Sequence, residues 1–467
     1  MNSDSENPAK VTRIWPYPVW IGLGLIALSI GTLHAVESLG RAFEVTFGML
    51  ALGSAGLLLV ARPIWRGSFR PGFRAALGLT TAIQLLALPL APSLSDDVYR
   101  YVWEGRVGIA GENPYLHAPT SEHLASLRDD EIWPNINHPD IRAAYPPFLQ
   151  AALRLGVRIW NSPLGQKLVF GAAHLLAFTL LWRLLNRHGQ PPQLALVLGL
   201  SPLGAVEFAG MGHSDSLTLA MTLGALAAHR SRRGLLAGTL LACATGTKYL
   251  PLALLPFFVR RNGLRPLLSF VATMIALYAP WVPLGNPAEA FAGARAYANL
   301  EPTGGSAFPL LSRALEELCL AVWPCSGDVV NHDQIHDKAL GTAKLFFAFA
   351  GLLLFVRAVR QHISAERFAL WLGLFFLVAS PTVHPWYVAA YLLPLAAVRR
   401  SPLLLLTTGS IVASYHLLPG WLDQGVWQQS TIWSVVAWTP LWIWLVNRAT
   451  KRWTPVRNAQ TRTPASR

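Results

Sequence analysis

The chain has 467 residues, of which 53% are hydrophobic and only 13% are charged. A soluble globular domain has about 25% charged residues, so this composition excludes a soluble enzyme, a disordered chain and a secreted disulfide scaffold, and it indicates a polytopic membrane protein. The net charge of +14 does not imply a nucleic-acid partner, because Lys and Arg residues accumulate in the cytoplasmic loops of membrane proteins.

Apolar stretches recur along the whole chain, each close to the roughly 20 residues that a membrane-spanning helix needs. The first, residues 17–35, is too long for the apolar region of a signal peptide and has no small-residue cleavage site, so we expect it to remain as a span. The stretches that read as spans are 17–35, 43–61, 75–92, 164–186, 193–211, 215–229, 265–284, 338–357, 366–383, 386–398, 401–418 and 431–447. We therefore predict that residues 1–450 form one all-α integral membrane domain, a polytopic helical bundle of about 12–14 spans.

Basic residues mark one side of this bundle. Most of the 38 Lys and Arg residues fall in segments that share a side of the membrane if the N-terminus is cytoplasmic, and few of the 24 acidic residues do. By the positive-inside rule, both termini are predicted to lie in the cytoplasm, and the number of crossings is even. This topology leaves two long outward loops, residues 93–145 and 285–337, and a basic cytoplasmic tail, residues 451–467, that we expect to be disordered.

The first outward loop carries a dense polar motif directly after a span, Ser95-Asp96-Asp97-Val98-Tyr99-Arg100-Tyr101-Val102-Trp103-Glu104-Gly105-Arg106. One interpretation is a capped helix, with Ser95 as the N-cap and Asp96 paired with Arg100 one turn later. The other is a ligand site at the outer membrane surface. Side chains that bind sugars or phosphates cover two faces of this helix: Asp97, Tyr101 and Glu104 on one, and Asp96, Arg100 and Trp103 on the other.

Residues 146–161 follow the motif Tyr145-Pro146-Pro147 and are apolar enough to resemble another span. Arg154 and Arg158 lie inside them, and a crossing here would move the arginines that follow the next span to the outer side. We therefore predict a helix that lies at the outer membrane interface rather than a span.

Further polar groups stand at the ends of predicted spans. The motif Gly212-His213-Ser214-Asp215 joins two of them, and Glu207 lies inside the first, where an ionisable side chain is costly and usually functional. Residues 234–259 are flanked by arginines at both ends and are too short to cross twice. They form either two short helices or a re-entrant hairpin, with Lys248 at the tip.

The segment Ser380-Pro381-Thr382-Val383-His384-Pro385-Trp386-Tyr387 joins two further spans. The charge pattern places this segment, the hairpin tip and the Gly-His-Ser-Asp motif on the same face as the acidic pair of the first loop. A single histidine at a span end is commonly an interfacial anchor, but four polar groups on one face favour a ligand site.

Taken in order, these motifs resemble the GT-C superfamily of membrane glycosyltransferases, and in particular the bacterial polyprenyl-phosphate-mannose-dependent α-mannosyltransferases. The resemblance rests on Asp-Asp-Val-Tyr-Arg-Tyr, Trp-Glu-Gly, Asn-Pro-Tyr, Tyr-Pro-Pro, Gly-His-Ser-Asp, Thr-Lys-Tyr-Leu-Pro and His-Pro-Trp-Tyr, which run from Asp96 to Tyr387. It implies a catalytic acid in the first outward loop, which corresponds to Asp96 or Asp97. The family's first acid favours Asp96, and the doublet leaves the choice open.

The resemblance implies that a sugar, expected to be mannose, moves from a polyprenyl-phosphate-sugar donor to a lipid or glycan acceptor on the outer face of the cytoplasmic membrane. The phosphate leaves as a stable anion, so one carboxylate suffices as general base in an inverting single displacement, whereas a glycosidase needs two. The candidate donor ligands are Arg100, Tyr101, His213, Lys248 and His384, and the candidate acceptor or pocket residues are Glu104, Tyr145, Asp215, Trp386 and Tyr387. For the aromatic residues, an interfacial belt is the alternative.

This chemistry requires no cofactor, and the sequence has no glycine fingerprint of a nucleotide-binding domain. Residues 331–337 place His332 and His336 four positions apart, so a divalent cation is left open there, with a solvated polar loop as the alternative.

Two other functions use a similar architecture. A lipid-linked glycan flippase or transporter should carry charges near the membrane midplane and broken helices in matched halves, and only Glu207 and residues 234–259 fit that description. A polysaccharide polymerase would rely on an arginine-rich outer loop, whereas the second loop offers few arginines, Arg295 and Arg313 among them. The position of most acidic residues in outward loops favours chemistry at the membrane surface.

Within the second loop, the Gly- and Pro-rich residues 301–309 predict the hinge of a lid, with an ordered connection as the alternative.

Overall fold

The computed structural model describes residues 15–283, 285–298, 300, 303–322, 332–428 and 430–450. Within these ranges the chain is helical, and the only β-type pairing is an isolated antiparallel bridge between Gly304 and Thr382. The predicted all-α membrane fold is therefore confirmed. The tail that we expected to be disordered lies outside the described residues.

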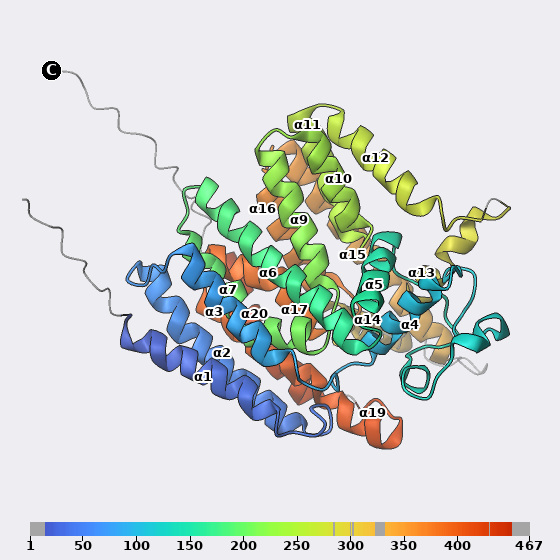
Figure 1. Cartoon of the computed structure of the whole chain (residues 1–467), viewed down its shortest axis with the longest axis horizontal. Helices are drawn as coiled ribbons and strands as arrows, with labels where there is room; N and C mark the ends of the chain where they lie inside the picture. The colour runs from blue at the N-terminus through green and yellow to red at the C-terminus, as the bar shows by residue number, and fades with distance from the viewer. Residues whose placement is uncertain are drawn as a thin grey trace, which may run out of the picture.

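The α-helices are numbered α1 to α20 in chain order (Figure 1). Those of the N-terminal half are α1 (Tyr17–Leu33), α2 (Phe43–Arg66), α3 (Phe73–Ala87), α4 (Asp97–Ile109), α5 (Pro147–Ile159), α6 (Pro163–Arg187), α7 (Leu196–Gly199), α8 (Pro202–Ala205), α9 (Asp215–Arg230) and α10 (Gly234–Thr245). Those of the C-terminal half are α11 (Leu255–Asn262), α12 (Arg265–Tyr278), α13 (Ala292–Ala298), α14 (Ala307–Val322), α15 (His332–Arg360), α16 (Ala365–Ala379), α17 (Pro385–Arg399), α18 (Pro402–Ser410), α19 (Leu418–Gln424) and α20 (Thr431–Thr450). Short 3-10 turns are η1 (Glu122–Leu127), η2 (Trp133–Asn135), η3 (Pro192–Ala195), η5 (Leu250–Leu254), η6 (Pro287–Phe291) and η7 (Ile411–Leu417), and η4 (Val206–Gly210) is a π turn.

Several helices are long and apolar enough to cross a membrane. Among the described residues, four pass by length and composition, namely Phe43–Arg66, Pro163–Arg187, Gln334–Arg360 and Pro402–Gln424, and a bent pair over residues 192–210 adds a fifth. Tyr17–Leu33, Phe73–Ala87, Gly234–Thr245 and Arg265–Tyr278 are shorter apolar helices. On α15, Leu345, Phe346 and Phe349 are exposed, as expected for a helix that faces lipid. The protein is thus a multi-pass membrane protein, and the number of 12–14 crossings stays a prediction.

The first long loop predicted from the sequence, residues 93–145, contains α4 and leads into α5. A Cβ atom added at Gly105 of α4 would lie 2.7 Å from the carbonyl oxygen of Leu153, so only glycine allows α5 to approach α4 this closely. α5 buries Leu149 and Leu153 and exposes Leu155 and Ile159, which gives it the two-faced character predicted for an interfacial helix. In Figure 1, α4, α5 and α13 lie together at one end of the molecule.

Residues 192–210 form a helix that is broken in the middle and bent by 60°. At the break, Ser201 caps α8 by accepting the backbone N–H of Gly204 at 3.2 Å, and Pro202 occupies the first helical position, where it needs no N–H partner. The second half ends in the π turn η4, a type of turn that is frequent at functional sites. Gly212 then adopts a φ of +81° and directs the chain into His213.

Residues 234–262 fold back as a hairpin. α10 forms the first arm, and η5 and α11 form the second. The hairpin closes beside the end of α9, because Asn262 Nδ2 lies 2.9 Å from His229 Nδ1 and Arg261 donates to the carbonyl oxygen of Arg230. The sequence left open two short helices or a hairpin, and the structure shows a hairpin built from short helices with Lys248 at its tip.

Candidate functional site

Two carboxylates stand at the start of α4. Asp96 is the N-cap residue and Asp97 is the first helical residue, so the prediction of Ser95 as N-cap is wrong by one position. The hydroxyl of Ser95 still accepts the backbone N–H of Asp97 at 3.2 Å. Asn137 Nδ2 donates to Oδ1 of Asp96 at 3.0 Å and to Oδ1 of Asp97 at 2.7 Å, so a distant part of the loop holds both carboxylates together.

The two carboxylates differ in their surroundings. Asp97 is half-buried and accepts a long hydrogen bond of 3.5 Å from the Tyr101 hydroxyl. Asp96 is accessible to solvent, yet the crowding of protein atoms around it, followed by the charge of Asp97, raises the pKa of its carboxyl group to about 6. A carboxylate with this pKa accepts a proton more readily than an ordinary aspartate, which suits a general base near neutral pH.

Arg100 and Glu104 form a buried ion pair on α4, with 2.7 Å between Arg100 Nε and Glu104 Oε1. Arg100 therefore pairs with Glu104 and not with Asp96, which corrects the pairing expected for a simple capped helix. The guanidinium also donates to three carbonyl oxygens of the loop, those of Asn137, His138 and Ile141. The second carboxylate oxygen of Glu104 accepts the Gln150 amide of α5 at 2.6 Å. Both side chains are thus occupied in holding α4, α5 and the loop together.

Lys248, at the hairpin tip, forms an ion pair with Asp215, the first residue of α9. Nζ donates to both carboxylate oxygens, at 2.9 and 2.8 Å, and the Asp215 side chain is only 1% exposed. The ammonium group also lies 4.4 Å from the ring centroid of Tyr387 and 5.9 Å from that of Tyr145. An ammonium group has three N–H donors, so one remains for a ligand while Asp215 fixes the position of the side chain.

Three rings from two motifs form a stack. Trp386 lies between His213, with ring centroids 3.7 Å apart, and His384, with centroids 4.3 Å apart. Behind the stack, the buried Glu207 has Oε2 2.9 Å from His213 Nδ1, and its Oε1 accepts the Tyr415 hydroxyl at 2.8 Å. Within the described residues, the buried His213 Nε2 has no hydrogen-bond partner.

His384 is neutral at physiological pH, because burial lowers its pKa to about 4 even though Asp97 lies near enough to oppose the shift. Its imidazole can therefore donate or accept a hydrogen bond but does not act as a cation for phosphate. Asp96 interacts electrostatically with His213, and Asp97 with Lys248 and His384. The motifs of the first loop, the α9 start, the hairpin and the α17 start therefore converge on one site.

Tyr101 and Tyr145 complete the wall of this site. Their rings meet edge to face with centroids 5.8 Å apart, and the Tyr101 hydroxyl lies 3.5 Å from Ser214 Oγ. The Asn-Pro-Tyr motif anchors the wall from behind, because the Tyr115 hydroxyl donates to the carbonyl oxygen of Tyr145 at 2.7 Å and Asn113 donates to that of Trp281 at 2.8 Å.

Of residues 301–309 the structure describes 303–309, and these residues are hydrogen-bonded to other parts of the protein. Val383 N donates to the carbonyl oxygen of Thr303 at 3.0 Å, and Thr303 N donates to Thr382 Oγ1 at 3.4 Å. Trp438 Nε1 donates to the carbonyl oxygen of Gly304 at 3.2 Å. In this structure the predicted hinge is therefore an ordered strap bound to the segment that leads into His384, which matches the alternative of an ordered connection.

Gly304→Ala is expected to disturb this strap. Gly304 has a φ of +67°, and an added Cβ would collide with the carbonyl oxygen of Val383. We expect a destabilisation on the order of 1–3 kcal/mol, seen as a lower Tm, and a several-fold slower sugar transfer because His384 loses its support. Gly425→Ala is the matched control, since Gly425 has the same φ of +67° but open space around it. Equal effects of the two variants on transfer would show that the contact with Val383 does not matter.

Two polar residues of this region were not singled out from the sequence. Asn137 bridges the two carboxylates from an irregular part of the loop, where no periodicity predicts what its side chain meets. Lys167, the fifth residue of α6, is buried, donates to the carbonyl oxygen of Leu90 at 2.7 Å, and lies beside Gly212. The signal that could have pointed to Lys167 was a lysine near the start of the apolar stretch 164–186.

The cation alternative at residues 331–337 lies partly outside the described residues. The side chain of His332 is not described, and His336 Nδ1 lies 3.2 Å from Glu316 Oε2. The two histidines thus remain an untested alternative.

The polar groups gather at the loops and helix ends, and this distribution suits sugar transfer at a membrane surface. The class of protein is therefore a multi-pass membrane glycosyltransferase. Residues 24–261 match the family described as alpha-(1->6)-mannopyranosyltransferase, N-terminal domain, and residues 144–381 match glycosyltransferase family 87. Each match spans just over half of the chain, so the chain belongs to these hexosyltransferase families. No curated protein matches it.

These matches confirm the resemblance to GT-C mannosyltransferases and the prediction of an enzyme that transfers a hexose. The first match covers the acidic pair of α4 and the Lys248–Asp215 pair, and the second begins just before Tyr145 and ends before His384.

Proposed function

We propose that this enzyme transfers mannose from a polyprenyl-phosphate-mannose donor to a lipid or glycan acceptor on the outer face of the cytoplasmic membrane. The observation that carries the proposal is the meeting of an acidic pair with a fixed ammonium group. Asp97, which Asn137 links to the accessible Asp96, interacts electrostatically with Lys248, and Asp215 holds Lys248 in place. A base for a hydroxyl and a cation for a phosphate are the two groups that this transfer needs. The arginine distribution of the sequence supports the outward orientation.

In the proposed reaction, Asp96 is the general base. The acceptor hydroxyl oxygen attacks the anomeric carbon of the donor, and its proton passes to the Asp96 carboxylate. The bond between the anomeric carbon and the phosphate oxygen breaks, and its electron pair leaves with polyprenyl phosphate. The configuration at the anomeric carbon inverts, because attack and departure occur on opposite faces. Asn137 keeps Asp96 oriented through its amide hydrogen bond, and the negative charge of Asp97 raises the basicity of Asp96.

Lys248 is proposed to bind the donor phosphate through the N–H that Asp215 leaves free. Asp215 then serves to hold Lys248 in place. Arg100, which the sequence suggested for the same role, is assigned instead to positioning the loop, because it already makes hydrogen bonds to Glu104 and to three loop carbonyls. Glu104, which the sequence suggested as a pocket residue, is likewise assigned to supporting the loop, because it pairs with Arg100 and accepts the Gln150 amide.

The sugar is proposed to lie against the aromatic groups of the site. The half-buried Tyr145 and Tyr387, whose rings lie beside Lys248, offer ring surface to the sugar, and the Trp386 ring supports the site from between His213 and His384. Tyr101 and His384 complete the pocket through hydroxyl and imidazole groups. No cofactor takes part in these steps.

The test is transfer of radiolabelled mannose by the purified protein in the presence of a membrane-lipid extract. We expect label in a new mannosylated product when the donor is polyprenyl-phosphate-mannose, and none when it is nucleotide-linked mannose. Transfer from the nucleotide-linked sugar alone would reject the proposed donor.

The pH dependence offers an independent prediction. Because Asp96 must be unprotonated and its pKa is raised to about 6, kcat/KM should fall about tenfold per pH unit below that value and level off above it. Asp97 contributes to the raised pKa, so Asp97→Asn should move the acidic limb to lower pH. Initial rates between about pH 4.5 and 8 measure both effects. A profile that is flat across this range would argue against Asp96 as the base.

A further inference from the structure

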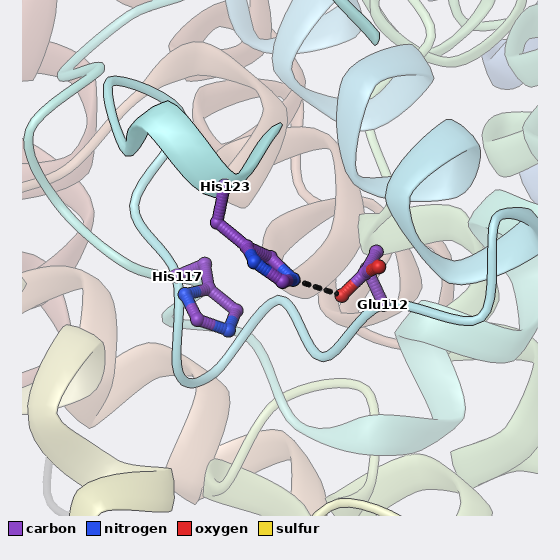
Figure 2. A group of neighbouring side chains, drawn as sticks. All are labelled: Glu112, His117 and His123. Carbon is purple, nitrogen blue, oxygen red and sulfur yellow. Dashed lines mark hydrogen bonds and ion pairs between the residues drawn. The ribbon is translucent and has the colours of Figure 1, made fainter. Parts of the chain in front are cut away.

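Three metal-binding side chains meet in the first outward loop, on the segment that follows α4 (Figure 2). Glu112 comes directly after Gly111, whose φ of +83° ends the helix, and the N–H of Glu112 donates to the carbonyl oxygen of Val107 at 3.1 Å. His117 lies in the turn that follows, and His123 lies in η1. A helix end, a turn and a short 3-10 helix thus present three ligands to one point.

The ligand atoms of these residues all lie within 4.8 Å of one another. His123 Nε2 is 2.7 Å from Glu112 Oε2, and the imidazoles of His117 and His123 stack with centroids 4.3 Å apart and planes 21° apart. In the described part of the chain, no hydrogen bond occupies the ring nitrogens of His117. Glu112 and His117 are half-buried, whereas His123 is exposed, so solvent reaches the cluster.

We propose that Glu112, His117 and His123 bind a divalent transition-metal ion of the Zn²⁺ type, with water as the fourth ligand. Two imidazole nitrogens and a carboxylate oxygen are a ligand set that zinc accepts in tetrahedral geometry, with metal–ligand distances of about 2.0–2.2 Å. Ligand atoms around such an ion lie about 3.4 Å apart. The three ligand atoms already lie within 4.8 Å of one another, and the ion would replace the direct hydrogen bond between His123 and Glu112.

The position of the cluster gives the ion a structural task. The segment that carries His117 and His123 is bonded to the segment that carries Asn137: Thr120 N and Oγ1 both donate to the carbonyl oxygen of Pro139, at 3.1 and 3.3 Å. Asn137 in turn holds Asp96 and Asp97. An ion that fixes residues 112–123 therefore stiffens the support of the acidic pair without entering the reaction.

The test is metal binding by the full-length, tag-free protein in detergent, after treatment with a chelator. Zn²⁺ is titrated and the bound metal is quantified by mass spectrometry, and Co²⁺ serves as a second probe because four-coordinate sites give it intense visible absorption. We expect one ion per chain. Loss of a histidine ligand should weaken binding by at least the roughly 10- to 100-fold that loss of a supporting residue costs. His117→Ala and His123→Ala should therefore both fail to retain the ion.

His188→Ala is the matched control. His188 Nε2 lies 3.6 Å from Glu366 Oε1, so it also forms a His–Glu pair, but in the described chain only Glu112, His117 and His123 form a three-ligand cluster. The control should bind as the wild type does. Absence of stoichiometric binding to the wild-type protein would overturn the proposal without any variant, and so would equal binding by the wild type and the two ligand variants. Because the readout is metal content, its failure is distinct from failure of the proposed sugar transfer.

Discussion

Asp96→Asn is expected to lower kcat by at least about 10²-fold while leaving donor binding nearly unchanged. Asparagine keeps the shape of the side chain and can still contact Asn137, but it cannot take the proton of the acceptor hydroxyl. Without a base, the attacking oxygen must lose its proton to water, which general base catalysis otherwise avoids. Single-turnover transfer from labelled polyprenyl-phosphate-mannose, with donor binding measured separately, resolves the two steps.

Asp97→Asn is the matched comparison for this experiment. Asp97 lies beside Asp96, accepts the same Asn137 amide and is half-buried. We expect a smaller loss of kcat, because Asp97 acts on the pKa and orientation of Asp96 and does not take the proton. If Asp97→Asn abolished transfer and Asp96→Asn did not, the two roles would have to be exchanged.

Lys248→Met is the change with the second largest expected effect. A hydrogen bond to a charged group contributes roughly 1.5–3 kcal/mol, so loss of the phosphate contact should lower kcat/KM by about 10- to 10²-fold, through both a higher donor KM and a lower kcat. The same change leaves the Asp215 carboxylate buried without a partner, which costs about 3–5 kcal/mol when a buried pair is broken. A fall in activity could therefore arise from unfolding alone.

The double variant Lys248→Met/Asp215→Asn separates these causes. Removing both charges relieves the unpaired carboxylate, so its Tm should return toward the wild-type value while transfer stays low. Donor titrations and thermal unfolding in the same detergent provide the two readouts. Recovery of transfer together with stability in the double variant would mean that Lys248 is a structural residue and that another group binds the phosphate.

The helical framework could be predicted from the sequence because it follows from simple physics. Apolar length and arginine position predicted a helix over residues 146–161, where α5 lies, and they left two forms open for residues 234–259, one of which is the hairpin with Lys248 at its tip. The dense motif at residues 95–106 correctly marked a helix with acidic residues at its start. In each case the signal lies in residues that are close in the sequence and that share one environment.

The pairing of individual side chains could not be predicted in the same way. Arg100 has a carboxylate four residues away on either side, Asp96 and Glu104, and local spacing does not choose between them. The choice depends on the loop carbonyls of Asn137, His138 and Ile141, which surround the guanidinium only once the loop has folded. The contact between Glu207 and Tyr415 joins residues far apart in the chain and likewise depends on how the spans pack.

The central claim is that one carboxylate carries out the transfer in a single displacement from a lipid-linked donor. The most direct measurement is the anomeric configuration of the newly formed glycosidic bond, determined by NMR on the product made by purified enzyme from a donor of known configuration. The account predicts a product whose configuration is opposite to that of the donor. A product with the donor's configuration would contradict the account, because it would require a covalent sugar–enzyme intermediate and a second reacting carboxylate.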